Sequence, residues 1–152
     1  MKKSLLTSTG ALVLAGVLSS SLAYADGPER VPPVRDKVVQ AECGACHLTF
    51  QPAFLPAKSW KKIMTGLDDH FGEDASLDKD VAQTIEDYLV SNSGRRKWND
   101  SWGKPPIRIT KLRWFVKEHR GEISRRAMKK AGTMVNCKAC HLEAERGNYD
   151  DD

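Results

Sequence analysis

Hydrophobic residues recur three or four positions apart over several short stretches of this chain, which is the period of an α-helix. The clearest stretch, 77–90, has four apolar side chains on one face: Val81, Ile85, Tyr88 and Leu89. Asp78 lies near its amino end, where a negative charge stabilises a helix. No run of strict apolar–polar alternation is long enough to form a sheet, so the pattern predicts an all-α fold.

Two further helices are predicted before this stretch. Apolar residues at helical spacing over 34–47 predict a helix that delivers the first of two cysteine motifs on its inner face. Pro52 and Pro56 then interrupt the helical pattern. We expect Ser59 to cap a helix that begins after them and runs to about Leu67.

A segment rich in glycine, asparagine and proline, 91–106, indicates a boundary between two lobes. Helices are predicted over 109–120 and 123–131, and Gly132 ends the second of them. Each lobe then contains one of the two cysteine motifs. The predicted lobes are 26–94 and 95–152.

The amino terminus has the organisation of an export signal. Lys2 and Lys3 form a positive region, 5–18 is mostly apolar or small, and 23–25 (AYA) is a small-x-small cleavage site. We therefore predict a signal peptide over 1–25 and a mature protein that is soluble in the periplasm. An uncleaved anchor is the alternative, but the apolar run is short of the roughly 20 residues that a spanning helix needs.

All four cysteines lie in two pentads of the form C-x-x-C-H: residues 43–47 (CGACH) and 137–141 (CKACH). Two cysteines three positions apart on a helical turn can form thioether bonds to both vinyl groups of one porphyrin, and the adjacent histidine can bind the iron. The pentads therefore predict two covalently attached haem c groups. Four thiols and two proximal histidines would hold them: Cys43, Cys46, Cys137, Cys140, His47 and His141.

Zinc, a redox dithiol and disulfides are the alternatives for these cysteines. The two cysteine pairs of a zinc ribbon lie about 15 to 20 residues apart, whereas 94 positions separate Cys43 from Cys137. A thioredoxin-like motif occurs singly and needs no following histidine. Because thioether bonds would use every thiol, we expect no disulfide framework. The porphyrins would supply much of the core, and the apoprotein should be largely unfolded.

Charge is divided unevenly between the two predicted lobes. Residues 26–94 contain 7 Lys and Arg against 12 Asp and Glu, a net charge of −5. Residues 95–152 contain 15 against 8, a net charge of +7. The two regions are either plain solvated faces or surfaces that steer a redox partner and neutralise haem propionates. Nucleic acid is not expected as a partner in the periplasm.

Two histidines lie outside the pentads, and the sixth ligand of each iron decides its chemistry. His70 follows His47 by 23 residues, and His119 precedes His141 by 22. With two iron sites and two spare histidines, we expect each to be the distal ligand in its own lobe, which gives a closed, electron-transferring site. Three methionines are the alternative ligands: Met64, Met128 and Met134.

The first pentad is followed by the motifs LPAKSW and HFGEDASL, and the chain resembles the bacterial dihaem cytochrome c family. The resemblance implies a periplasmic electron carrier with two bis-histidine haems, a cytochrome c-like first lobe and a less typical second lobe. His70 in HFG and His119 in KEH match the distal ligands of the family. The implied partners are an oxygen-binding monohaem cytochrome c and a membrane b-type cytochrome. The similar segments cover nearly all of the mature chain: 42–92, 105–110, 114–115, 117–119 and 136–141.

Two functions compete on these residues. The first is an electron shuttle without enzymatic activity, in which two closed haems relay single electrons between redox partners. The second is a small dihaem redox enzyme, a peroxidase or gas-reducing protein, in which one iron keeps an open position. The shuttle is favoured because each iron has a spare histidine, and because two small lobes leave little chain for a substrate pocket.

Overall fold

The computed structural model describes residues 30–94 and 104–150. The predicted signal peptide and the middle of the predicted boundary segment lie outside the described residues. Five α-helices form the described part, and its only β contacts are two isolated bridges, so the all-α prediction is confirmed. The helices are α1 (Lys37–Cys43), α2 (Ala57–Met64), α3 (Lys79–Ser91), α4 (Arg113–His119) and α5 (Arg125–Ala131). Short 3₁₀ turns connect them: Pro52–Phe54, Leu67–Asp69, Ile109–Lys111, Cys137–Ala139 and Ala144–Arg146.

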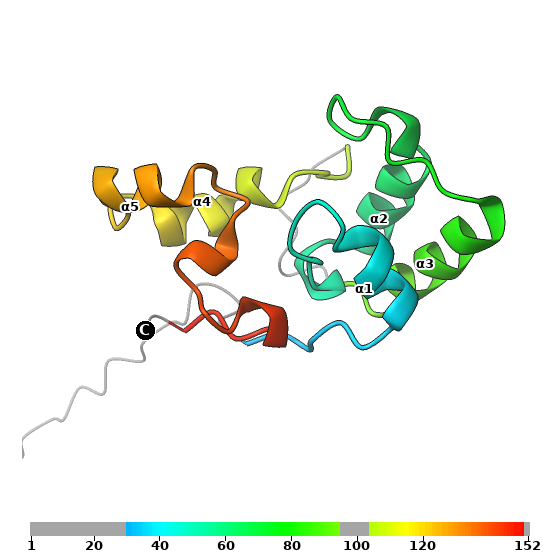
Figure 1. Cartoon of the computed structure of the whole chain (residues 1–152), viewed down its shortest axis with the longest axis horizontal. Helices are drawn as coiled ribbons and strands as arrows, with labels where there is room; N and C mark the ends of the chain where they lie inside the picture. The colour runs from blue at the N-terminus through cyan, green and yellow to red at the C-terminus, as the bar shows by residue number, and fades with distance from the viewer. Residues whose placement is uncertain (1–29, 95–103, 151–152) are drawn as a thin grey trace, which may run out of the picture.

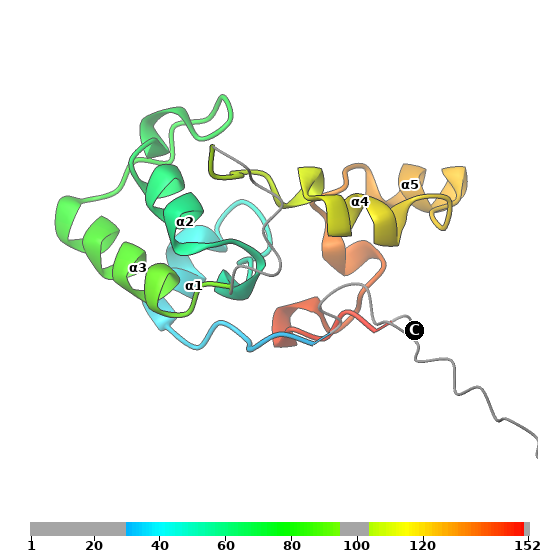
Figure 2. The same cartoon turned by 180° about the vertical axis from the view of Figure 1, so that it is seen from behind.

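Helices α1, α2 and α3 gather at one end of the molecule, and α4 and α5 lie at the other (Figure 1). The C-terminal segment returns to the start of the described chain, where Val31 N–H donates to the Gly147 carbonyl at 2.9 Å. Gly147 has φ 76°, and a Cβ there would lie 2.0 Å from the Val31 carbonyl oxygen. Only glycine therefore permits this approach. Figure 2 shows the same two segments side by side from behind.

Helix α1 is shorter than predicted and ends at the first cysteine. The Asp36 carboxylate accepts from the backbone N–H groups of Val38 and Val39 at 2.9 and 3.0 Å, which fixes the start of the helix. Gly44 follows the last helical residue, and a Cβ there would lie 2.3 Å from the Gln40 carbonyl oxygen. The rest of the first pentad therefore leaves the helix as a turn.

The prediction that Ser59 caps the second helix is wrong. Helix α2 begins at Ala57, and the Pro56 carbonyl accepts from the backbone of Ser59 and Trp60 at 2.9 and 3.2 Å. The proline ring fixes φ, and Pro56, at φ −74° and ψ 160°, is the N-cap, so the residue that interrupts the pattern also starts the helix. Ser59 is fully buried inside the helix instead.

Helices α3 and α5 follow their predicted patterns closely. In α3, Ile85 is fully buried and Leu89 nearly so. In α5, the Ser124 hydroxyl accepts from Ala127 N–H at 3.1 Å, and Gly132, at φ 73°, ends the helix. The apolar face of α3 is therefore buried as predicted, although the Asp78 side chain at its N-cap makes no capping hydrogen bond.

One hydrophobic cluster joins residues from both predicted lobes. Its buried members are Val34, Val39, Leu55, Trp60, Ile85, Leu89, Leu112 and Phe115. Gln51, also fully buried, donates to the Ala144 carbonyl at 2.7 Å and accepts from the Tyr149 hydroxyl. Since an unpaired buried amide is costly, this side chain fixes the C-terminal segment against the first lobe. Among the described helices, none is long and apolar enough to cross a membrane.

Candidate haem sites

The first pentad begins at the last residue of α1 and places one cysteine, Cys43, in a half-buried position. Cys43 is half-buried and Cys46 is exposed, and the structure forms no disulfide between them. Burial raises the pKa of the Cys43 thiol to about 11. His47 Nδ1 lies 2.7 Å from the carbonyl oxygen of Leu48. A proton on Nδ1 therefore donates to this carbonyl and leaves Nε2 free for a metal.

His70 faces His47 across the first site, with ring centroids 6.2 Å apart and ring planes at 24°. A tight turn presents it, in which His70 N–H donates to the Glu73 carbonyl at 2.7 Å. Phe71 in this turn has φ 62°, a strained conformation for a bulky residue. The Asp69 carboxylate stabilises the turn by accepting from Gly72 N–H at 3.0 Å.

A residue from the second predicted lobe packs against this turn. The Arg108 guanidinium lies 3.9 Å from the centroid of the Phe71 ring, a cation–π contact. Burial lowers the pKa of His70, and the nearby charges of His47 and Arg108 lower it further. His70 is therefore poised as a neutral imidazole, the form that binds metals.

The second site repeats the ligand set in a different arrangement. Cys137 is half-buried in a 3₁₀ turn, Cys140 is exposed, and neither forms a disulfide. Burial raises the pKa of the Cys137 thiol to about 11. The His119 and His141 ring centroids lie 6.1 Å apart with ring planes at 84°. His119, the last residue of α4, places Nδ1 2.8 Å from the Phe115 carbonyl oxygen, which again leaves Nε2 for a metal.

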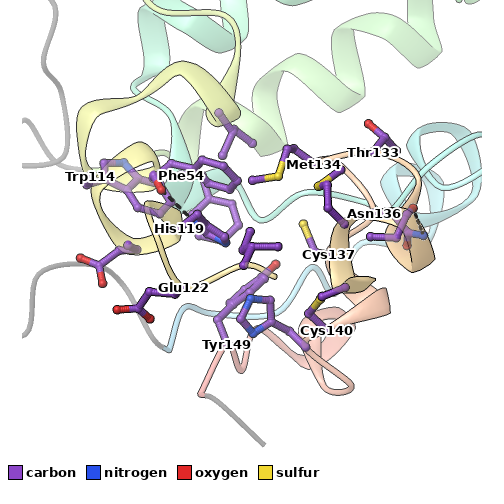
Figure 3. Close-up of a pocket in the computed structure, with 18 of the residues that line it drawn as sticks. Phe54, Trp114, His119, Glu122, Thr133, Met134, Asn136, Cys137, Cys140 and Tyr149 are labelled. Atoms are coloured by element: carbon purple, nitrogen blue, oxygen red, sulfur yellow. Dashed lines mark hydrogen bonds between the residues drawn. The ribbon is translucent and has the colours of Figure 1, made fainter. Parts of the chain in front are cut away.

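A cavity of about 700 Å³ opens between these two histidines. Its volume lies within the range of small-molecule and cofactor sites, about 300–1,000 Å³. Figure 3 shows Phe54, Trp114 and Met134 on one side of this space and Cys140 and Tyr149 on the other. Its walls are therefore mostly aromatic and apolar, as a porphyrin requires.

Three polar atoms of the cavity lining are buried without a hydrogen-bond partner: Trp114 Nε1, Glu118 Oε1 and His141 Nδ1. Buried polar groups normally form hydrogen bonds, so three unpaired polar atoms in one cavity indicate that the cavity binds a group with polar atoms of its own. The Trp114 N–H is a donor that suits the propionate of a haem.

The residues present fit two covalent haems. Metal–imidazole bonds are about 2 Å long, so a metal between two imidazoles sets their ring centroids roughly 6 Å apart, as in both pairs. Each pair adjoins two thiols that form no disulfide. The described residues contain no group of three or more His, Cys, Asp and Glu side chains able to hold a metal ion.

The fold and the sites together define a covalent haem protein. The family model of dihaem cytochrome c matches residues 39–149. The chain belongs to the dihaem cytochrome c family, whose members carry two covalently bound haem c groups. No curated protein sequence matches the chain.

Two bacterial structures illustrate the similarity. A dihaem cytochrome c from Rhodobacter sphaeroides is 44% identical with a TM-score of 0.72, and the match covers 78% of this chain and 99% of that one. A dihaem cytochrome type c from Shewanella baltica OS155 is 36% identical with a TM-score of 0.63, with 75% and 86% covered. The helical architecture and the two haems are therefore shared with solved relatives.

The structure brings His70 to His47 and His119 to His141, which is the pairing predicted within each lobe. Ligation of iron by these four residues stays a prediction. Met128 and Met134 line the cavity that contains His119, whereas Met64 packs against the hydrophobic core.

Sequence reasoning missed Phe50. Its ring stacks on His47 with centroids 4.9 Å apart, and it also lines the cavity of the second site. It is an aromatic residue three positions after a pentad, and this was the only signal available. Tyr149, which packs edge-on against His141 at 5.5 Å, was missed as well.

Proposed function

We propose that this protein relays single electrons between redox partners and that all four histidines bind iron. His47 and His70 are the ligands at the first site, and His119 and His141 those at the second. The observation that carries the proposal is the separation of the two imidazole pairs, 6.2 and 6.1 Å between centroids. Haem supplies one-electron oxidation and reduction when it is bound.

Electron transfer is favoured over catalysis when histidines fill both axial coordination positions of each iron. A haem iron has two axial positions besides the four porphyrin nitrogens, so two imidazoles would leave none for a substrate, and the same pairing of histidines occurs at both sites. At each site one histidine has Nδ1 within hydrogen-bond distance of a backbone carbonyl, Leu48 for His47 and Phe115 for His119, so a proton on Nδ1 would leave Nε2 for the metal. A dihaem peroxidase or gas-reducing enzyme would need one of these pairs to open.

Phe50 supports a relay between the sites, because one ring contacts the proximal histidine of the first and lines the cavity of the second. Closed ligation at each site and a side chain shared by both suit transfer within the molecule. The protein therefore transfers electrons between its two haem sites and has no substrate of its own.

The relay operates in the periplasm after removal of residues 1–25. This location follows from the amino-terminal export pattern. The partners are an oxygen-binding monohaem cytochrome c and a membrane b-type cytochrome, as the family resemblance implies. The donor and the acceptor would meet the haems at the protein surface.

Spectroscopy of the mature protein tests the proposal. Optical and EPR spectra should be purely low-spin in both oxidation states, and the reduced protein should bind no carbon monoxide. An intact mass two haems above the polypeptide 26–152 is the control for complete loading. A high-spin component or a carbon monoxide complex in the fully loaded wild-type protein would contradict closed ligation and favour the enzyme.

A further inference from the structure

Helix α5 forms part of the wall of the cavity of the second site and has two opposite faces. Ala127, Met128 and Ala131 line the cavity. The remaining four residues of the helix are exposed cations: Arg125, Arg126, Lys129 and Lys130. At 3.6 residues per turn, the centre of the cationic set lies about 180° around the helix from the centre of the cavity-lining set.

The cations on α5 are available to a partner. Within the described part of the chain, the salt bridges of the second lobe lie elsewhere, such as Lys138 with Glu145 and Arg146 with Glu143. The helix itself contains no acidic residue. Four like charges on one face of a seven-residue helix repel one another by a few tenths of a kcal/mol per close pair. An acidic surface would relieve this repulsion.

The wall formed by α5 is thin. A helix with its side chains is about 10–12 Å across, so a protein resting on the cationic face lies one helix away from the second site. Most exposed acidic residues of the first lobe lie on α3 and on the segment 68–78 that precedes it, and α3 is at the opposite end of the molecule from α5 (Figure 1). The two ends of the molecule therefore present opposite charges to an approaching protein.

We propose that the cationic face of α5 (Arg125, Arg126, Lys129 and Lys130) is the docking surface for an acidic redox protein that exchanges electrons with the second haem. This inference rests on the proposed relay function. Each encounter moves one electron between the partner and the protein, and no bond forms or breaks. A lipid surface is disfavoured because a basic helix binds membranes through its apolar face, and the apolar face of α5 is committed to the cavity.

The test uses the mature, haem-loaded protein and a strongly acidic flavodoxin as the probe. The test variant changes all four cations of α5 to Gln. The matched control changes four exposed lysines of the first lobe to Gln: Lys58, Lys61, Lys62 and Lys79. Both variants lose the same net charge, so a difference between them reports the position of the charge.

Stopped-flow mixing with fully reduced flavodoxin gives the second-order rate constant, and calorimetry with both proteins oxidised gives the dissociation constant. We expect the α5 variant to lose at least about tenfold in the rate constant at low ionic strength, the lower end of electrostatic steering. The dissociation constant should rise in parallel, independently of any change in haem potential. The difference should vanish in high salt, and the control should stay within about twofold of the wild type.

Three results would overturn the docking surface. The α5 variant could match the wild type, or the control could lose as much, which would indicate diffuse net charge. Alternatively, vesicles with anionic lipid could bind the wild type and not the α5 variant while flavodoxin exchange is unchanged, which would assign the face to a membrane. Failure of the wild type to exchange electrons at any salt concentration would instead contradict the relay function.

Discussion

The imidazole rings of His119 and His141 lie nearly perpendicular to each other, at 84°, with centroids 6.1 Å apart. In the first site, the rings of His47 and His70 have almost the same spacing but lie at 24°. Local contacts set this difference. His119 stacks on the Phe115 ring at 4.0 Å and bonds the carbonyl of the same residue. Two pentads of identical form therefore take part in two histidine pairs with different ring orientations.

This contrast predicts two distinguishable low-spin EPR signals. Near-parallel imidazole planes separate the energies of two iron d orbitals, whereas perpendicular planes leave these orbitals almost equal in energy. The fully oxidised protein should therefore show one rhombic signal and one signal of greater anisotropy in equal amounts. Low-temperature EPR measures both, and substitution His119→Ala should remove only the more anisotropic one. Two identical rhombic signals would contradict the ring orientations.

Substitution of either distal histidine should open one site and leave the other closed. His70→Ala and His119→Ala should each convert half of the haem to a high-spin form that binds one equivalent of carbon monoxide when reduced. Optical titration with carbon monoxide measures the fraction.

Met128 and Met134 provide the control for this experiment, since both line the cavity of His119. If His119→Ala stays low-spin, the double variants with Met128→Leu and Met134→Leu identify the replacement ligand. If a histidine variant keeps two low-spin haems, a methionine supplies the ligand. The assignment of that histidine is wrong if the methionine already occupies this position in the wild type.

Removal of haem should unfold the second lobe. The side chains that line the cavity of about 700 Å³ are mostly apolar and aromatic, and they lose their packing partner when the haem is absent. A variant with Cys137→Ser and Cys140→Ser, which cannot attach the second haem, should show lost helical circular dichroism and rapid proteolysis after 104. A protease-resistant second lobe in this variant would contradict a haem-built core.

Local patterns predicted the features that depend on near neighbours. The pentads, the buried face of α3 and the end of α5 at Gly132 all follow from residues within a few positions of one another. The prediction for Ser59 was wrong because Pro56, taken only as an interruption of the helical pattern, is itself the N-cap residue.

The missed features depend on contacts between distant parts of the chain. Gln51 bonds Ala144 and Tyr149, 93 and 98 positions away, and nothing near Gln51 predicts its burial. Arg108 reaches the ring of Phe71, which follows His70 directly in the other part of the chain. These contacts fix how the two sites lie relative to each other, and a periodic pattern contains no such information.

Phe50 offers the sharpest test of transfer between the two sites. Its ring contacts His47 at 4.9 Å between centroids and lines the cavity of the second site. Electronic coupling falls steeply with the width of a gap, so loss of the ring should weaken the connection. Phe50→Leu should therefore slow intramolecular electron transfer severalfold. Pulse radiolysis, which reduces one haem and follows the approach to equilibrium, measures this rate.

Phe54→Leu is the matched control, because Phe54 lines the same cavity and packs against Trp114 and Tyr149 without a ring contact to His47. Both substitutions replace one apolar side chain by another of similar volume and should cost less than about 1.5 kcal/mol of stability. A general disturbance of the packing would slow electron transfer equally in the two variants. A shift in the reduction potentials of the two haems could also account for a slower rate, so both potentials are measured. Slower transfer confined to Phe50→Leu, at unchanged potentials, would assign the connecting role to this one ring.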